Sequence, residues 1–254
     1  MGATEQHGPR LPCAVDSIIS AGVVGHALER LPAHVPSFAM APITYGKSEE
    51  HSHFPGTMTL TGETLLAPMN EIGESVYRAG FRKLLIVNGH SGQPQIMEIS
   101  AREMGLHHGD FIVVSSFTWR VPHSAGKYLS DREKMLVMHA GDAETTLVLA
   151  LAPDTLRMDR AVANFPSEFP SKLLSPDGRP ACAWTARDLG PCGIIGDPLP
   201  ATAEQGHDIL DSLIISWAQA MTKLHDLQWA PRAEATWSRA QYTGHIQTTQ
   251  NTLA

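Results

Sequence analysis

The sequence contains only three cysteines among 254 residues, and no two of them form a Cys-x-x-Cys motif. This odd number argues against a disulfide framework and favours free thiols in a reducing compartment. No apolar run approaches the roughly 18–20 residues that a membrane-spanning helix needs, and the first residues lack the basic and apolar segments of a signal peptide. The sequence therefore predicts a cytoplasmic protein that does not contact a membrane.

Basic residues are also scarce, because 19 Lys and Arg stand against 26 Asp and Glu, which gives a net charge of −7. A chain without a basic surplus has little with which to neutralise phosphates, so nucleic acid is excluded as the main partner. Histidine, in contrast, is abundant at 13 residues. Neutral imidazole is the commonest metal ligand in proteins, so the histidines are the first candidates for a functional site.

Apolar periodicity predicts helices and short strands that alternate along the chain. Helices are expected over residues 16–31, 63–79, 94–104, 142–152 and 205–224, and strands over 38–44, 83–87 and 111–116. Such alternation predicts an α/β fold in which helices cover both faces of a mostly parallel sheet. A region rich in Pro and Gly, 164–200, is expected to be a long loop. We expect one domain over residues 1–229, followed by a polar tail or oligomer arm over 230–254.

The first candidate site lies in the N-terminal segment, where Glu5 and His7 are two residues apart. In an extended segment such residues point to the same side, so both can reach one point. Asp16 follows a short turn and opens the first predicted helix. Its carboxylate has two oxygens and could bridge two cations, although it could equally be an N-cap, with Glu5 and His7 on the surface.

Two further clusters lie at the ends of predicted elements. His90 directly follows the strand expected over 83–87, at the edge of the sheet where α/β proteins place their sites, although a loop histidine that faces solvent is the alternative. His139 precedes the helix expected over 142–152, and Glu144 lies in its first turns. A carboxylate there can merely answer the helix dipole, but the apolar neighbours of Glu144 favour a buried role.

Together these residues offer a mixed set of nitrogen and oxygen ligands, namely Glu5, His7, Asp16, His90 and Glu144. Such a set suits Zn, Mn or Fe(II). These ions lower the pKa of bound water from about 15.7 toward about 7, so one or two of them per chain, zinc being our first choice, would supply a nucleophile. His139 is left for proton transfer or substrate contact.

Four motifs in this sequence resemble those of the creatininase family, in the same order. They are GATEQHGPRLPCAVD from Gly2, YGKSEEHSHFPGT from Tyr45, NGHSGQ from Asn88 and HAGDAETT from His139. The resemblance implies a three-layer α/β/α sandwich, a cyclic homo-oligomer such as a hexamer, and a small-molecule substrate. It also implies an amidohydrolase, which cuts the C–N bond of a cyclic amide, formamide or related compound with metal-activated water.

The resemblance also implies roles for individual residues. By position, Glu5 and His90 match the ligands of one metal, His7 matches a ligand of a second, and Asp16 matches the bridge between them. Ser48 matches a serine that contacts substrate. His139 and Glu144 match a histidine and a glutamate that catalysis in creatininase needs.

The sequence departs from creatininase itself at several positions, which argues against creatinine as the substrate. Ser91 and Gly92 stand where creatininase has a tyrosine and a glutamate ligand, and Glu144 is the nearest candidate to replace that ligand. Residues 133–138 lack the tryptophan that covers the substrate. Arg10 replaces a histidine and could meet an anionic substrate group or be a solvated surface charge. Ser48, Ser91 and Arg10 form the predicted substrate-binding set.

Two other functions compete with the metal-dependent one. Residues 84–93 look like a nucleophile elbow with Ser91 as the nucleophile of a serine hydrolase, but Gln93 replaces the final glycine of that motif. This alternative leaves the ligand set unexplained. A non-catalytic, ligand-binding member of the family is the second alternative. Its support is that the family has a strand before the Glu-Gln-His motif, at which this chain begins.

Overall fold

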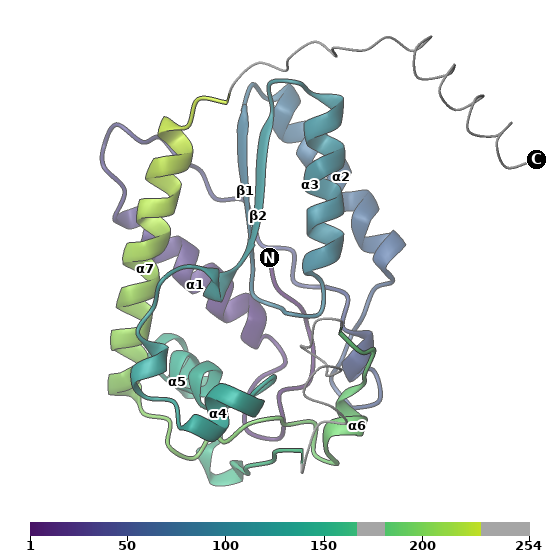
Figure 1. The fold of residues 1–254 in the computed structure, drawn as a ribbon, viewed down its shortest axis with the longest axis vertical. Helices are drawn as coiled ribbons and strands as arrows, with labels where there is room; N and C mark the ends of the chain where they lie inside the picture. The colour runs from purple at the N-terminus through teal and green to yellow at the C-terminus, as the bar shows by residue number, and fades with distance from the viewer. Residues whose placement is uncertain (167–180, 230–254) are drawn as a thin grey trace, which may run out of the picture.

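The computed structural model of the protein describes residues 1–166 and 181–229 (Figure 1). The predicted tail over 230–254 lies outside the described residues, as do residues 167–180 of the predicted loop. The remainder of that loop carries only isolated bridges and one short helix, α6 (Ala186–Leu189), as its Pro and Gly content predicts.

The sheet of the described residues consists of two parallel strands, β1 (Lys83–Asn88) and β2 (Ile112–Phe117). Their register pairs Lys83 with Ile112 and Asn88 with Phe117. Helix α3 (Pro94–His107) connects them, which is the crossover that parallel strands require. The continuous apolar run in β1 fits a strand that is covered on both faces.

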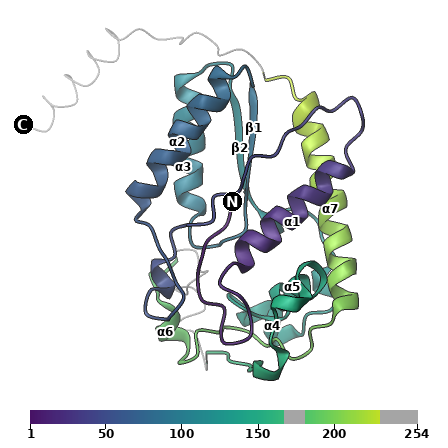
Figure 2. The ribbon, with the colours of Figure 1, turned by 180° about the vertical axis from the view of Figure 1, so that it is seen from behind.

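Helices flank this sheet on both sides (Figures 1 and 2). On one side α2 (Gly62–Arg78) packs against α3, and on the other α1 (Val15–Glu29) and α7 (Ala203–Asp226) contact β1. Helix α5 (Asp142–Leu151) packs against α1 and α7. Short elements complete the described chain: α4 (Asp131–Leu136), η1 (Glu49–His51), η2 (Thr118–Arg120), η3 (Ala125–Lys127), η4 (Pro153–Thr155) and η5 (Met158–Arg160). This layering confirms the predicted α/β class.

The main core lies where α1, α5 and α7 meet. The apolar stripe of α7 is buried there and is formed by Ile209, Leu213, Trp217 and Met221. Each fully buried side chain of this kind stabilises the fold by about 1.5–3 kcal/mol. The indole nitrogen of Trp217 also donates a hydrogen bond of 2.9 Å to the Thr118 carbonyl, which ties α7 to the segment that follows β2.

Two local predictions are wrong. Residues 38–44 form no strand, because the segment makes a single backbone bond, from Gly2 N to the Ile43 carbonyl, and Phe38 is 77% exposed. Asp16 is not the N-cap of the first helix, since α1 begins at Val15 with Ala14 at that position. Its side chain is buried and lies against His7 and His90 instead. None of the described helices has the length and apolarity to cross a bilayer.

The packing of α5 on α7 depends on Gly206, where a Cβ atom would overlap the Thr146 carbonyl oxygen. We predict that Gly206→Ala lowers the free energy of unfolding by about 1–3 kcal/mol, as overpacking does. Gly25 in α1 is the matched control, because no atom lies within 4 Å of a Cβ added there. Gly25→Ala should raise stability by about 0.5–1 kcal/mol. Urea denaturation of both variants tests this, and equal effects would contradict it.

Candidate metal centre

The N-terminal segment lies across the carboxyl end of β1 and brings the first motif to the edge of the sheet. The Met1 amino group donates to the Val87 carbonyl at 2.7 Å, and Gly89 N donates to the Met1 carbonyl at 2.8 Å. Glu5 and His7 follow on this segment and are both fully buried. The surface alternative for these two residues is therefore wrong.

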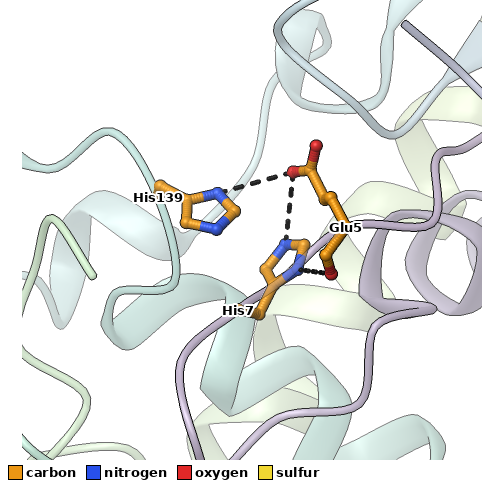
Figure 3. A group of neighbouring side chains, drawn as sticks. All are labelled: Glu5, His7 and His139. Atoms are coloured by element: carbon orange, nitrogen blue, oxygen red, sulfur yellow. Dashed lines mark hydrogen bonds and ion pairs between the residues drawn. The ribbon is translucent and has the colours of Figure 1, made fainter. Parts of the chain in front are cut away.

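The Glu5 carboxylate faces four histidines that come from different parts of the chain. Its Oε1 lies 3.2 Å from His90 Nδ1, 3.6 Å from His139 Nδ1, and 3.8 Å from both His7 Nε2 and His51 Nε2. Figure 3 shows how the His7 and His139 rings turn toward it. Four segments that are distant in sequence thus meet at one buried acid.

Asp16 lies between two groups of candidate ligands. Its Oδ1 is 3.6 Å from His7 Nε2, and its Oδ2 is 3.6 Å from His90 Nδ1. The ligand atoms of Glu5, Asp16 and His90 lie within 4.8 Å of one another, and so do those of His7, Asp16 and Glu144. The structure therefore brings all five predicted ligands together, with Asp16 shared between the two groups.

Several atoms of these groups have no hydrogen-bond partner in the part of the chain that the structure describes. They are both carboxylate oxygens of Glu5, Nε2 of His7 and Oδ2 of Asp16, all buried. His7 Nδ1 lies 3.2 Å from the Glu5 carbonyl and must donate to it, so Nε2 faces the site and offers its lone pair there once the ring is neutral. Unpaired buried charges cost several kcal/mol. A cation bound by mixed nitrogen and oxygen ligands removes that cost, so these residues fit a divalent metal.

The charges of the site shift its pKa values strongly. Burial favours neutral Glu5, but the neighbouring imidazoles, His90 foremost, hold the pKa of Glu5 well below its usual range. Burial and the charge of Glu5 raise the pKa of Asp16 to about 6. Burial lowers the pKa of His7, yet its contact with Asp16 outweighs this effect and raises the pKa to about 9. Protons thus occupy the positions that a metal would take, and metal binding must release them.

His139 differs from His7 and His90 because its pKa is lowered rather than raised, which holds the ring neutral. Its Nε2 lies 2.6 Å from the Gln6 carbonyl, which can only accept, so Nε2 carries the hydrogen and Nδ1 keeps its lone pair. Burial and the charges of His7 and His51 place the pKa of His139 well below its usual value. The ring lies between these two histidines and is tilted against both, at centroid distances of 4.2 and 4.0 Å. An imidazole so placed can take up a proton.

A strained turn before α5 positions His139 and Glu144. Ala140 between them has a φ of 56°, in the left-handed region that costs a non-glycine residue energy. Its N–H donates to Glu144 Oε2 at 2.6 Å, and its carbonyl accepts from Arg10, which also donates to Thr145 Oγ1 at 2.8 Å. Arg10 is 1% exposed, so the surface-charge alternative is wrong. Its contact with substrate stays a prediction.

The two predicted substrate-binding serines lie in different environments. Ser48 is fully buried, with its hydroxyl 3.3 Å from His90 Nε2. Ser91 is exposed in the turn after His90. A substrate contact therefore remains a prediction for both, and it is more direct for Ser91.

Reasoning from individual residues missed Glu50, His51 and Trp184. His51 Nδ1 accepts a hydrogen bond of 2.9 Å from the Gln6 amide, and the Trp184 ring lies edge-on to His51 with centroids 6.3 Å apart. Glu50 Oε1 is 3.2 Å from His90 Nε2. The motif at Tyr45 contains Glu50 and His51, but no pattern in the sequence predicts that this loop lies beside the carboxyl end of β1.

Known proteins resemble this chain over most of its length. The family model described as "Creatininase: Creatinine amidohydrolase" matches residues 1–221. A mycofactocin precursor peptide peptidase of Mycolicibacterium smegmatis is 30% identical, over 91% of this chain and 84% of that protein. A creatinine amidohydrolase of Pseudomonas putida is 32% identical, over 87% of this chain and 86% of that protein. The chain belongs to the creatininase family.

Solved structures agree with this assignment. A Bacteroides fragilis protein superposes with a TM-score of 0.75 over 90% of this chain and 89% of its own, at 23% identity, which shows the fold alone. A creatininase with Mn gives a TM-score of 0.68 at 27% identity, over 87% of this chain and 88% of that one. The protein is thus a hydrolase of the creatininase family. The relatives and the ligand groups support divalent metal binding.

Another buried carboxylate, Glu133, supports the turn before α5. Its Oε1 accepts from Asp142 N at 3.2 Å and from Asp197 N. Burial raises the pKa of Glu133 from 4.5 to about 7. Between these values the folded protein keeps a proton that the unfolded chain has released, so this group makes stability fall as pH rises from about 4.5 to about 7.

We predict that Glu133→Gln, which keeps an oxygen acceptor without the charge, stabilises the protein above pH 7 by about 1–3 kcal/mol. The gain should vanish below pH 4.5, where the wild-type carboxyl is protonated in both states. Asp131→Asn on the same helix is the control, because the Asp131 side chain is fully exposed. Unfolding free energies measured at pH 4.5 and 8 test this, and a gain independent of pH would contradict it.

Proposed function

We propose that this protein is an amidohydrolase that uses one or two divalent ions to hydrolyse the C–N bond of a cyclic amide, a formamide or a related small molecule. The observation that carries the proposal is the set of buried ligand atoms without partners around Glu5. Ionised or lone-pair atoms in such number are costly unless a cation binds them. Elemental analysis and activity with and without a chelator test the proposal directly.

Two ligand groups account for two ions. Glu5, Asp16 and His90 would hold the first, and His7, Asp16 and Glu144 the second, as the separations between their atoms allow. Zinc is our first choice, with Mn and Fe as alternatives. A bound ion of this kind supplies a nucleophile from water at neutral pH and polarises the amide carbonyl.

His139 is the proposed proton carrier. Hydrolysis forms a bond from the water oxygen to the carbonyl carbon and breaks the C–N bond, so one proton must move from water to the leaving nitrogen. The unprotonated Nδ1 of His139 faces the Glu5 carboxylate, beside the ligand groups. It can accept that proton and return it to the nitrogen. Ser48, Ser91 and Arg10 remain the proposed substrate contacts.

The relatives act on different amide substrates and do not identify the substrate of this protein. One is a creatinine amidohydrolase and another a peptidase of a precursor peptide. Ser91 and Gly92 differ from the creatininase pattern, so we propose a small amide other than creatinine. We also propose a cytoplasmic homo-oligomer, a hexamer by its resemblance to the family.

The geometry favours this function over a serine hydrolase. Ser91 is exposed, and no histidine or carboxylate hydrogen-bonds to its hydroxyl within residues 1–166 and 181–229. A serine nucleophile needs such a base. A serine hydrolase would also not explain the buried ligand atoms around Glu5 that have no hydrogen-bond partner.

We predict that Glu144→Gln lowers the metal content of zinc-loaded protein from near two toward one, with a large loss of activity. The amide is a weaker ligand than the carboxylate, and only the second group contains residue 144. Asp16→Ala should remove both ions, since Asp16 belongs to both groups. Elemental analysis after dialysis measures this. If Glu144→Gln retained both ions, its role as a ligand would be wrong.

We predict that His139→Ala slows turnover by roughly 10²–10⁴, the usual range for one acid–base group, while metal content is unchanged. The assay requires a substrate, which a screen of cyclic amides, lactams and formamides should provide. The ligand atoms of Glu5, His7 and His139 also lie within 4.8 Å of one another. Loss of metal from His139→Ala would therefore identify His139 as a ligand and overturn its role as a proton carrier.

A further inference from the structure

Glu50 lies beside the Nε2 nitrogen of His90, and an atom of its carboxylate is also within 4.8 Å of ligand atoms of Glu5 and His51. His90 Nδ1 faces Glu5 at 3.2 Å and Asp16 at 3.6 Å. Its other nitrogen, Nε2, faces Glu50 Oε1 at 3.2 Å and the Lys47 carbonyl at 2.9 Å. The two nitrogens of one buried ring thus have separate surroundings, one that suits a cation and one composed of acceptors.

Glu50 can reach this position only because residue 92 is a glycine. A Cβ atom added to Gly92 would overlap Glu50 Oε1 and lie 2.5 Å from His90 Nε2. The carboxylate of Glu50 therefore occupies the space that any side chain at residue 92 would need. Gly92 and Glu50 are complementary, although 41 residues of chain separate them.

A histidine that binds a metal must direct a lone pair at it, which requires the hydrogen on its other nitrogen. An acceptor at that nitrogen fixes the tautomer and the ring orientation, and a carboxylate acceptor also makes the ligand more basic. The Lys47 carbonyl can accept the Nε2–H bond of His90, but it carries no net charge. Among the described residues with a group at 3.3 Å or less from Nε2, only Glu50 supplies a negative charge.

We propose that Glu50 is the positioning residue for His90, which accepts the Nε2 hydrogen and strengthens the bond from Nδ1 to the first metal ion. The inference rests on the proposed metal centre and adds to it a residue outside the ligand set. Removal of such a carboxylate commonly weakens metal binding by about 10–100-fold. Glu50 affects catalysis only through His90.

The test measures zinc affinity by competition with a chromophoric chelator. Glu50→Ala should bind the tighter zinc ion about 10–100-fold more weakly than the wild type. Glu50→Gln, whose amide oxygen can still accept the hydrogen, should lie between the two. Glu49→Ala is the matched control, because Glu49 is the exposed neighbour and pairs with Lys47 at 3.0 Å. It should bind zinc like the wild type.

Two further measurements distinguish a positioning role from a structural one. The urea midpoint without zinc should be similar in Glu50→Ala and the wild type, and the ¹⁵N shift of His90 Nε2 should change on zinc-bound protein. Equal zinc affinity of Glu50→Ala and the wild type would overturn the inference and leave the proposed function intact. Loss of metal-free stability in proportion to the loss of zinc binding would also overturn it. A wild type that binds no zinc, Mn or Fe would overturn the proposed function itself.

Discussion

The burial of the Glu5 carboxylate is the constraint on which the rest of the site depends. An ionised acid without water or a hydrogen-bond donor is unstable in a protein interior unless positive charge surrounds it. Here that charge can come from the imidazolium groups of His7 and His90, whose pKa values are raised, or from a metal. Protons and a metal therefore compete for the same buried space, which links metal binding to pH.

The fold meets this constraint because one strand ends and two helices begin near the same edge of the sheet. The end of β1 carries His90, the first turn of α1 carries Asp16, and α5 begins beside His139. The close approach of α1 to this strand end needs a glycine, since a Cβ at Gly89 would overlap the backbone of Asp16. The core of α1, α5 and α7 then fixes the first turns of α1 and α5 relative to each other. Packing far from the ligands therefore sets the distances between the ligands.

The sequence predicts best the features that local pattern controls. The helices α1, α2, α3, α5 and α7 and the two observed strands follow from the apolar pattern, whereas the short helices α4 and α6 were not predicted. The prediction for residues 38–44 fails because an apolar segment becomes a strand only where a neighbour pairs with it. The ligand set could be proposed because its members lie at the ends of predicted elements. Arg10 was harder to interpret, since only the folded chain shows it buried beneath Ala140, where its hydrogen bond holds a turn that local sequence does not favour.

Gly92 shows why the effect of a departure from a motif cannot be inferred from the sequence alone. Read in sequence, it is the loss of a carboxylate ligand, which argues against creatinine as the substrate. In the structure two other carboxylates approach the same centre, Glu144 beside His7 and Asp16, and Glu50 beside His90. The second of these fits only if residue 92 has no side chain. Gly92 leaves room for a buried acid, which indicates that carboxylates at other positions replace the missing one. Loss of a functional site explains the glycine less well, because a non-functional site does not need a buried acid beside a histidine.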